Sequence, residues 1–244
     1  IYILVNGIPN LTTDLFSLHY NSKNQSMLPS IFNTVFITFL TLLIAVPIGI
    51  FSAVYLVEYA KKGSKLVKVI RVTTETLAGI PSIVFGLFGF LAFVIALGWG
   101  YSMIAGVLTL VMMVLPTIIR TTEEALLAVP NSYREGSFGL GAGKIRTIFK
   151  IIVPTAIPGI LSGVILAIGR IVGETAALIY TSGTVAETAT SLTDSARTLS
   201  VHLYCLLSEG LFTNQAYATA VILLLLVVGI NALSNFIAKK LAKK

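Results

Sequence analysis

The sequence predicts an all-α polytopic membrane protein, because its composition and its hydropathy pattern both depart from those of a soluble domain. Apolar residues make up 56% of the 244 residues and charged residues only 11%, against about 25% charged residues in an average soluble domain. Several apolar stretches are long enough to cross the roughly 30 Å hydrocarbon core of a bilayer as helices. We expect five membrane spans, at about 34–57, 76–97, 103–119, 155–180 and 216–237.

The first part of the chain, residues 1–33, is polar and rich in turn residues. It contains Asn6-Gly7 and Pro9-Asn10 and has no sustained hydrophobic period, which is typical of a loop. We therefore expect an extracytoplasmic N-terminal segment. The transmembrane domain then occupies residues 34–237.

The first two predicted spans contain different residues that affect helix shape and packing. The span at 34–57 contains Pro47 and Gly49, which predict a kink whose freed backbone groups are satisfied by neighbouring helices. The span at 76–97 begins with a block rich in small residues, Leu77 to Gly86. Small residues permit close approach between membrane helices.

The later spans are separated by segments of very different length. After the span at 103–119 comes a long polar loop, and the span at 155–180 is rich in glycine, which predicts a crowded helix. Residues 181–214 carry too many charges for a span but enough apolar residues for a structured loop. The span at 216–237 then leads to the C-terminus.

Positive charge is concentrated on one side of the predicted bundle. Of the 17 Lys and Arg residues, 14 fall in the loops 58–75 and 120–153 and in the basic tail 238–244. The positive-inside rule places these segments in the cytoplasm. The N-terminus is then outside and the C-terminus cytoplasmic. The net charge of +7 is therefore a consequence of topology, and we expect no nucleic-acid binding.

The loop 120–153 contains a polar, glycine-rich island that predicts two short helices. Ser132 and Glu135 have the spacing of a capping box, so a helix should begin there. Gly141 and Gly143 can supply the left-handed residue that ends it.

The second short helix is predicted to be amphipathic. Its cations are Lys144, Arg146 and Lys150, and its apolar residues follow a helical period. Two short helices at the edge of a membrane are better suited to docking a partner protein than to catalysing a reaction. The apolar positions are Ile145, Ile148, Phe149 and Ile152.

Arg170 and Glu174 are an ionisable pair inside an apolar stretch. Four residues apart on a helix, the two side chains would share a face and could neutralise each other. Charges within a membrane are costly and mark a pathway or a polar seam. Two interpretations remain open: Arg170 meets an anionic solute through its planar guanidinium, or the pair is structural.

Three further features could suggest a metal site, a phosphate-binding loop or an enzyme active site, but each lacks residues that such a site needs. Cys205 is the single cysteine, so neither an internal disulfide nor a cysteine metal cluster is expected. The stretch from Phe138 to Ile145 resembles a phosphate-binding loop but lacks its first glycine and its final Ser or Thr. His19 and His202 are far apart, and we expect neither a metal site nor an enzyme active site.

Several sequence blocks resemble one family, the PstA-type permease subunits of bacterial phosphate ABC importers. Glu135, Gly141, Ile151 and Pro154 have the spacing of the cytoplasmic loop motif of such permeases, although Gly136 and Ser137 replace its usual alanines. The other similar blocks are Tyr55 to Ala60, Leu77 to Gly86, Val129 to Gly141 and Leu166 to Ala177.

The resemblance implies a type I importer permease with a bundle of six helices. Five spans are visible, so the first helix of the family is expected to be missing. The expected partners are a homologous permease subunit, two ATP-hydrolysing subunits on the cytoplasmic side and an extracytoplasmic phosphate-binding protein. This chain would bind no cofactor itself, because ATP is used by the partner ATPase.

The resemblance also assigns roles to residues. The ATPase-docking loop would include Ser132, Arg134, Glu135, Gly141, Lys144 and Arg146. Alternating access would expose Arg170 and Glu174 to each side of the membrane in turn.

Three alternatives remain at this point. The chain could be the partner permease of the same importer, or a permease for molybdate or sulfate. A channel or secondary carrier that works without an ATPase belongs to a different class, and the docking loop argues against it.

Overall fold

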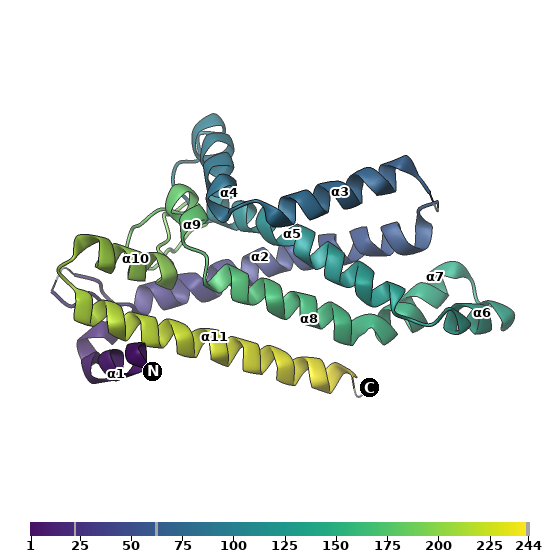
Figure 1. Cartoon of the computed structure of the whole chain (residues 1–244). Coiled ribbons are helices and arrows are strands. Elements are labelled where there is room, and N and C mark those ends of the chain that lie inside the picture. Colours follow the sequence, from purple (N-terminus) through teal and green to yellow (C-terminus); the bar gives the residue numbers. More distant parts are fainter. Residues whose placement is uncertain (22, 62, 243–244) are drawn as a thin grey trace. The chain divides into compact units, whose positions relative to one another are not determined.

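The computed structural model describes residues 1–21, 23–61 and 63–242, and within these ranges every regular element is helical (Figure 1). Four continuous helical stretches are long and apolar enough to cross a membrane, and a broken pair, α3 with α4 and η4, makes a fifth if it counts as one span. The all-α polytopic fold is thus confirmed. The candidate spans are Leu28–Tyr59, Met103–Leu127, Lys144–Val172 and Thr213–Phe236, with Lys65–Gly79 and Ser82–Ala96 as the broken pair.

The helices follow one another with few long connections. Three five- to seven-residue segments, η3, η4 and η5, are π-helical and extend the α-helices beside them, whereas η1 and η2 are short 3-10 segments. The bounds are α1 Tyr2–Gly7, η1 Ile8–Asn10, η2 Thr13–Phe16, α2 Leu28–Val54, η3 Tyr55–Tyr59, α3 Lys65–Gly79, α4 Ser82–Gly89, η4 Phe90–Ala96, α5 Met103–Leu127, α6 Asn131–Gly139, α7 Lys144–Thr147, η5 Ile148–Ile152, α8 Val153–Val172, α9 Ala176–Thr181, α10 Leu199–Glu209 and α11 Thr213–Ala242.

The chain divides into two compact units. Unit 1 contains Ile1–Leu42, Ile80–Met113 and Gly169–Ile230, and unit 2 contains Leu43–Gly79 and Val114–Ile168, together with the last residues from Asn231. Because α2, α5, α8 and α11 each begin in one unit and end in the other, neither unit is a separate stretch of sequence. Of the predicted basic segments, Lys62 and the end of the tail, Lys243 and Lys244, lie outside the described residues.

Helix α2 begins six residues before the predicted span. Pro29 stands in its first turn, where a missing N–H costs nothing. The hydroxyls of Thr34 and Thr38 donate to the carbonyls four residues earlier, at 2.6 and 2.7 Å. These polar residues therefore continue the helix rather than interrupt it.

The predicted second short helix around 145–152 is not separate from the span that follows. Residues Lys144–Val172 are continuously helical, with the π segment η5 lying just before Pro154. Proline has no N–H to donate and its ring crowds the carbonyl four residues earlier. The wider winding beside Pro154 relieves this conflict without ending the helix.

Unit 1 is held together by close contact between α4 and α9. Gly86 of α4 lies so near α9 that an added Cβ would stand 2.7 Å from the Cα of Ala177. Gly89, one turn later, faces Thr109 of α5 and Thr181 of α9. Two of the sequence blocks that carry the family resemblance therefore pack against each other.

This contact predicts a large effect of a single methyl group. Replacing Gly86 with alanine should lower the free energy of unfolding by about 1–3 kcal/mol, because an overpacked contact with backbone atoms cannot be relieved by a rotamer change. The change is measured as a lower melting temperature of the purified chain in detergent. Gly229→Ala in α11 is the matched control, since no heavy atom lies within 4 Å of its added Cβ. An equal loss in both variants would contradict the role of the contact.

The polar segment between α9 and α10 is ordered by buried side chains. The Asn33 amide of α2, 1% exposed, donates to the carbonyls of Glu187 and Arg197 at 2.9 and 3.2 Å and accepts from the N–H of Ala189 at 3.0 Å. Thr34 accepts from the first N–H of α10, at Leu199. The predicted structured loop thus depends on Asn33, the last residue of the predicted N-terminal segment, and on Thr34, the first residue of the predicted span at 34–57.

Unit 2 has its core where the ends of α2 and α5 meet the beginning of the Lys144–Val172 helix. The close approach of α5 and α8 depends on Gly159 and Gly163, which lie against Ala125 and Thr121. In Figure 1, α6 and α7 lie at the end of α5 and the start of α8. The core residues are Ala53, Val54, Leu126, Val129, Ile148, Ile152, Ala156 and Ile160.

Candidate functional site

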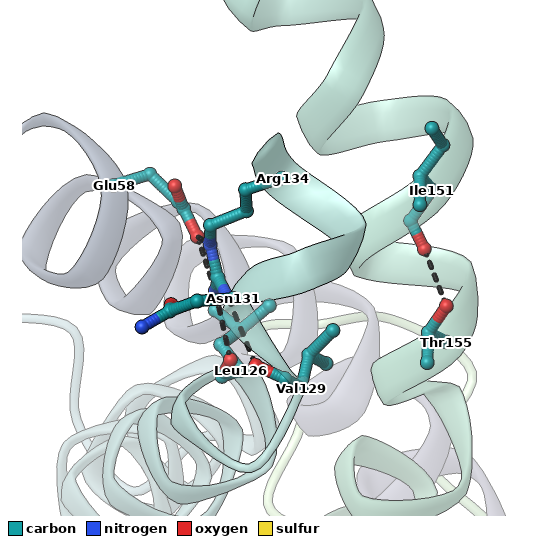
Figure 2. A network of polar contacts seen from close by, with 7 residues as sticks. All are labelled: Glu58, Leu126, Val129, Asn131, Arg134, Ile151 and Thr155. Carbon is teal, nitrogen blue, oxygen red and sulfur yellow. Dashed lines mark hydrogen bonds and ion pairs between the residues drawn. The ribbon is translucent and has the colours of Figure 1, made fainter. Parts of the chain in front are cut away.

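The docking turn, defined here as residues Asn131–Thr147, is anchored by Arg134. Its guanidinium makes an ion pair with Glu58 of η3, with Nε and Nη2 at 3.1 and 2.8 Å from Oε1. It also donates to the carbonyls of Val129 at 2.9 Å and Leu126 at 3.1 Å. Figure 2 shows this side chain reaching between Glu58 and the end of α5.

These bonds explain why α6 is held firmly after only a short connection. The last carbonyls of a helix have no partner within the helix, and a cation is stabilised at the negative end of the helix dipole. The Arg134 side chain is 16% exposed and that of Glu58 is 10% exposed. Arg134 therefore anchors the docking turn, and it is Glu58, 76 residues away, that sequence reasoning missed.

The start of the docking turn differs from the predicted capping box. Helix α6 begins at Asn131, with Pro130 as its N-cap, and no side chain caps it. Ser132 therefore lies inside the first turn, and the prediction that it caps the helix is wrong. Proline at this position, with its fixed φ of −56°, directs the chain into the helix without a side-chain bond. Glu135 is exposed on α6.

The predicted glycine turn is confirmed at Gly141, whose φ is +80°. Gly143 is wrong as the left-handed residue, because its φ is −70° and it is instead the N-cap of α7. The turn is closed by a buried hydroxyl pair, Ser137 Oγ and Thr147 Oγ1, 2.8 Å apart. This pair links α6 directly to α7.

The outer surface of the docking turn is apolar and open. A groove of about 660 Å³ is lined by residues of α6 and of the turn after it. Leu140 is 92% exposed at its edge. Contiguous exposed apolar surface is a common feature of protein-contact sites. The lining residues are Ser132, Tyr133, Gly136, Ser137, Leu140, Gly141, Ala142, Arg146 and Ile151.

In unit 1, the expected ion pair between Arg170 and Glu174 does not form among the described residues. Helix α8 ends at Val172, so the two residues are not one helical turn apart. Arg170 is half-buried in the last turn of α8, and the structure gives its guanidinium no hydrogen bond or ion pair to a described residue.

Glu174 has a different role from the predicted one. It is 8% exposed, and its Oε1 accepts from the N–H of Ala177 in the first turn of α9, at 3.0 Å. Its backbone carbonyl accepts from Ser200 Oγ at 2.6 Å. Glu174 thus fixes the start of α9 and links it to α10, while the Arg170 side chain remains available.

Comparison with known proteins identifies the family. Residues 45–244 match the family model described as the binding-protein-dependent transport system inner membrane component. The chain belongs to this family. As a member it is the membrane-embedded, non-catalytic permease subunit of an ABC importer, with several spans in the inner membrane.

Named relatives agree with this assignment. A probable ABC transporter permease of Bacillus subtilis, YqgI, is 33% identical over 100% of this chain and 88% of its own length. The phosphate transport system permease PstA 1 of Mycobacterium tuberculosis is 45% identical over 57% of this permease but only 45% of its own length. PstA of Mycobacterium leprae is 38% identical, over 78% of this permease and 62% of its own length. The resemblance to PstA-type permeases is thus confirmed.

Solved structures show the same fold. The permease shares a TM-score of 0.71 with a chain of a bacterial ABC transporter involved in alginate import, at 16% identity, over 98% of this permease and 87% of that chain. The inward-facing MetNI methionine transporter gives a TM-score of 0.65 at 19% identity, over 98% and 96%. The predicted type I permease bundle is confirmed by these similarities.

Unit 1 contains a buried polar cluster whose members the sequence analysis did not group together. His202 of α10 is fully buried, and its Nδ1 lies 3.3 Å from Nη1 of Arg197. The ring of Tyr20 packs edge-on against His202 and beneath the Arg197 guanidinium. Burial is the main reason why the pKa of His202 is lowered from 6.5 to about 4. The positive charge of Arg197 lowers this pKa further, and a backbone hydrogen bond with Gln25 acts in the opposite direction.

This pKa predicts a loss of stability in acid. Between pH 6.5 and about 4 the unfolded chain binds a proton at His202 that the folded chain does not, so stability present above this window is lost as the pH falls. At about pH 5 the loss should be about 2 kcal/mol, seen as a lower melting temperature in detergent. His202→Asn should flatten this dependence, and the exposed His19→Asn should not. An unchanged pH profile in His202→Asn would contradict the assignment.

Proposed function

We propose that this permease is a subunit of an ATP-driven phosphate importer. It forms the translocation pathway with a homologous permease and couples to an ATPase dimer through residues Ser132–Arg146. The observation that carries the coupling is the rigid, exposed docking turn: Arg134 fixes it to α5 and η3, while its groove and Leu140 face outward. A surface that must transmit movement has to be both exposed and firmly anchored.

Phosphate as the solute is supported by the relatives. Both mycobacterial proteins are named phosphate transport system permeases. Arg170 offers chemistry that suits this anion, because its guanidinium has no partner among the described residues and its donors match a phosphate oxyanion. In this proposal Arg170 meets the solute, and Glu174 holds α9 and limits how tightly the anion is bound.

The orientation follows from the distribution of charge. The basic loops and the C-terminal tail lie in the cytoplasm, where the ATPase binds and uses ATP, and the N-terminus lies outside. The segment 1–33 and the ordered loop between α9 and α10 then face the extracytoplasmic phosphate-binding protein. This chain needs no cofactor of its own for these roles.

Thiol labelling in intact cells tests the orientation. With Cys205 replaced by serine, Glu135→Cys introduces a single thiol at an exposed position of α6. A membrane-impermeant maleimide should label it only after the cells are broken open. Asp14→Cys, exposed in the N-terminal segment, should be labelled in intact cells and is the matched control. Labelling of Glu135→Cys from outside would overturn the proposed coupling.

Uptake measurements test the solute. Cells that produce the complete transporter should take up radioactive phosphate, and excess molybdate or sulfate should not compete. Competition by either oxyanion would favour the alternative permeases. Complementation distinguishes the two permease subunits of the importer. This chain should restore uptake in cells that lack the PstA-type subunit, whereas restored uptake in cells that lack the other permease would favour that subunit instead. A carrier without an ATPase would copurify with no ATP-binding subunit.

A further inference from the structure

A second surface of unit 2 combines positive charge with exposed apolar side chains. It is a groove of about 820 Å³ at the start of the Lys144–Val172 helix. Ile145 is 67% and Phe149 45% exposed in it. Its lining consists of Gly143, Lys144, Ile145, Arg146, Phe149 and Lys150. We call this surface the basic groove.

No acidic residue that the structure describes neutralises the positive charge of the basic groove. No acidic residue lines the groove, and the described ion pairs involve other residues. The Lys144 ammonium lies 4.7 Å above the centre of the Tyr59 ring, and Arg146 and Lys150 are exposed. Three cations within seven residues therefore have no anionic partner in the described ranges.

The apolar side of the basic groove continues into the surface of a membrane span. The Phe149 ring lies 6.5 Å from that of Phe51 in α2, and Phe51 is 60% exposed and Tyr55 51% exposed. Both belong to the candidate span Leu28–Tyr59. Apolar side chains exposed on a span face lipid chains, and cations at the end of a span lie at the headgroup level.

We propose that the basic groove binds an anionic phospholipid of the membrane leaflet next to the docking turn. The Arg146 guanidinium and the Lys150 ammonium bind the lipid phosphate, because a guanidinium matches phosphate oxygens with two parallel bonds. The acyl chain packs along Phe149 and Phe51. The lipid then lies against the helix that begins directly after the docking turn.

This inference goes beyond the proposed function, which assigns residues Ser132–Arg146 to the ATPase, because the basic groove extends past that segment to Phe149 and Lys150. The two surfaces share Arg146, whereas Lys150 lines only the basic groove. An acidic surface of the ATPase subunit is the competing occupant. Its apolar part would then have to cover Phe149 and also Phe51, which belongs to a candidate membrane span.

Fluorescence quenching by brominated lipid tests the inference in the assembled transporter. Ile145→Trp places a reporter in the basic groove, and Trp99→Phe removes the natural tryptophan while keeping a ring on Phe93. In nanodiscs of phosphatidylcholine, brominated phosphatidylglycerol should quench the reporter at a lower mole fraction than brominated phosphatidylcholine. Arg146→Gln with Lys150→Gln should weaken this preference by on the order of tenfold, given the attraction of each cation to an anionic surface.

A control pair of lysines distinguishes a specific lipid site from a general attraction of lipid to surface charge. Lys65→Gln with Lys68→Gln removes the same charge from exposed positions on α3 and should leave the preference unchanged. Equal quenching by both lipids, an equal loss in the α3 pair, or quenching that appears only after the ATPase subunit is removed would each overturn the proposal. None of these readouts involves phosphate uptake, so failure of the proposed function would be recognised separately.

Discussion

Replacing Arg134 with alanine should detach the docking turn and abolish copurification of the ATPase subunit. The substitution leaves Glu58, whose side chain is 10% exposed, without its counter-charge, and it removes the donors to Leu126 and Val129. Losing one partner of a largely buried ion pair costs about 3 kcal/mol. The measurements are the melting temperature of the purified permease and the amount of ATPase recovered with it.

Two variants control this result. Arg120→Ala also removes an arginine from an ion pair, with Glu124 at 3.0 Å, but both side chains are more than half exposed, so the loss of stability should be much smaller than in Arg134→Ala. Glu58→Gln combined with Arg134→Gln leaves no uncompensated charge and should recover part of the stability. Full ATPase binding by Arg134→Ala would contradict the anchoring role.

Replacing Arg170 with glutamine should reduce phosphate uptake at least about tenfold, because about 1.4 kcal/mol of lost interaction with an anion already has that effect. The side chain has no partner among the described residues, so its removal breaks no described bond and assembly should persist. Uptake by cells and recovery of the partner subunits are measured on the same preparation. Uptake at the original level would remove Arg170 from the solute pathway.

Arg170→Lys is the informative companion variant. It keeps the positive charge but loses the planar fork that binds two phosphate oxygens together. Intermediate uptake is expected if Arg170 contacts the anion. If Arg170 instead only stabilises the end of α8 through the helix dipole, lysine should serve equally well. Failed assembly of Arg170→Gln would favour this structural role.

The spans were predictable because a membrane-crossing helix requires apolar residues along most of its length, which hydropathy detects. The four long candidate spans overlap the predicted ones, but the predicted span at 155–180 is not one helix, because α8 ends at Val172 and α9 begins at Ala176. The predicted span at 76–97 is broken at Ile80–Pro81 in the structure, since the residue before a proline is disfavoured in a helix. Hydropathy, which averages over a window, cannot detect such a break.

The polar contacts were less predictable because they depend on the fold. The i, i+4 prediction for Arg170 and Glu174 required an unbroken helix, and α8 ends at Val172. Glu58 and Arg134 are 76 residues apart, and no periodicity connects them. The capping box failed for a local reason: with Pro130 as its N-cap, the helix begins two residues earlier than it would with Ser132 as its N-cap.

The π segments have a consequence for length variation in this permease. A π-helical turn contains one residue more than an α-helical turn needs. Deleting one residue from Tyr55–Tyr59 or from Ile148–Ile152 would restore regular winding and keep the flanking helical faces aligned. The same deletion within the α-helical part of a span would rotate every later side chain by about 100°. Natural insertions and deletions within the spans should therefore concentrate at these two segments, beside the docking turn.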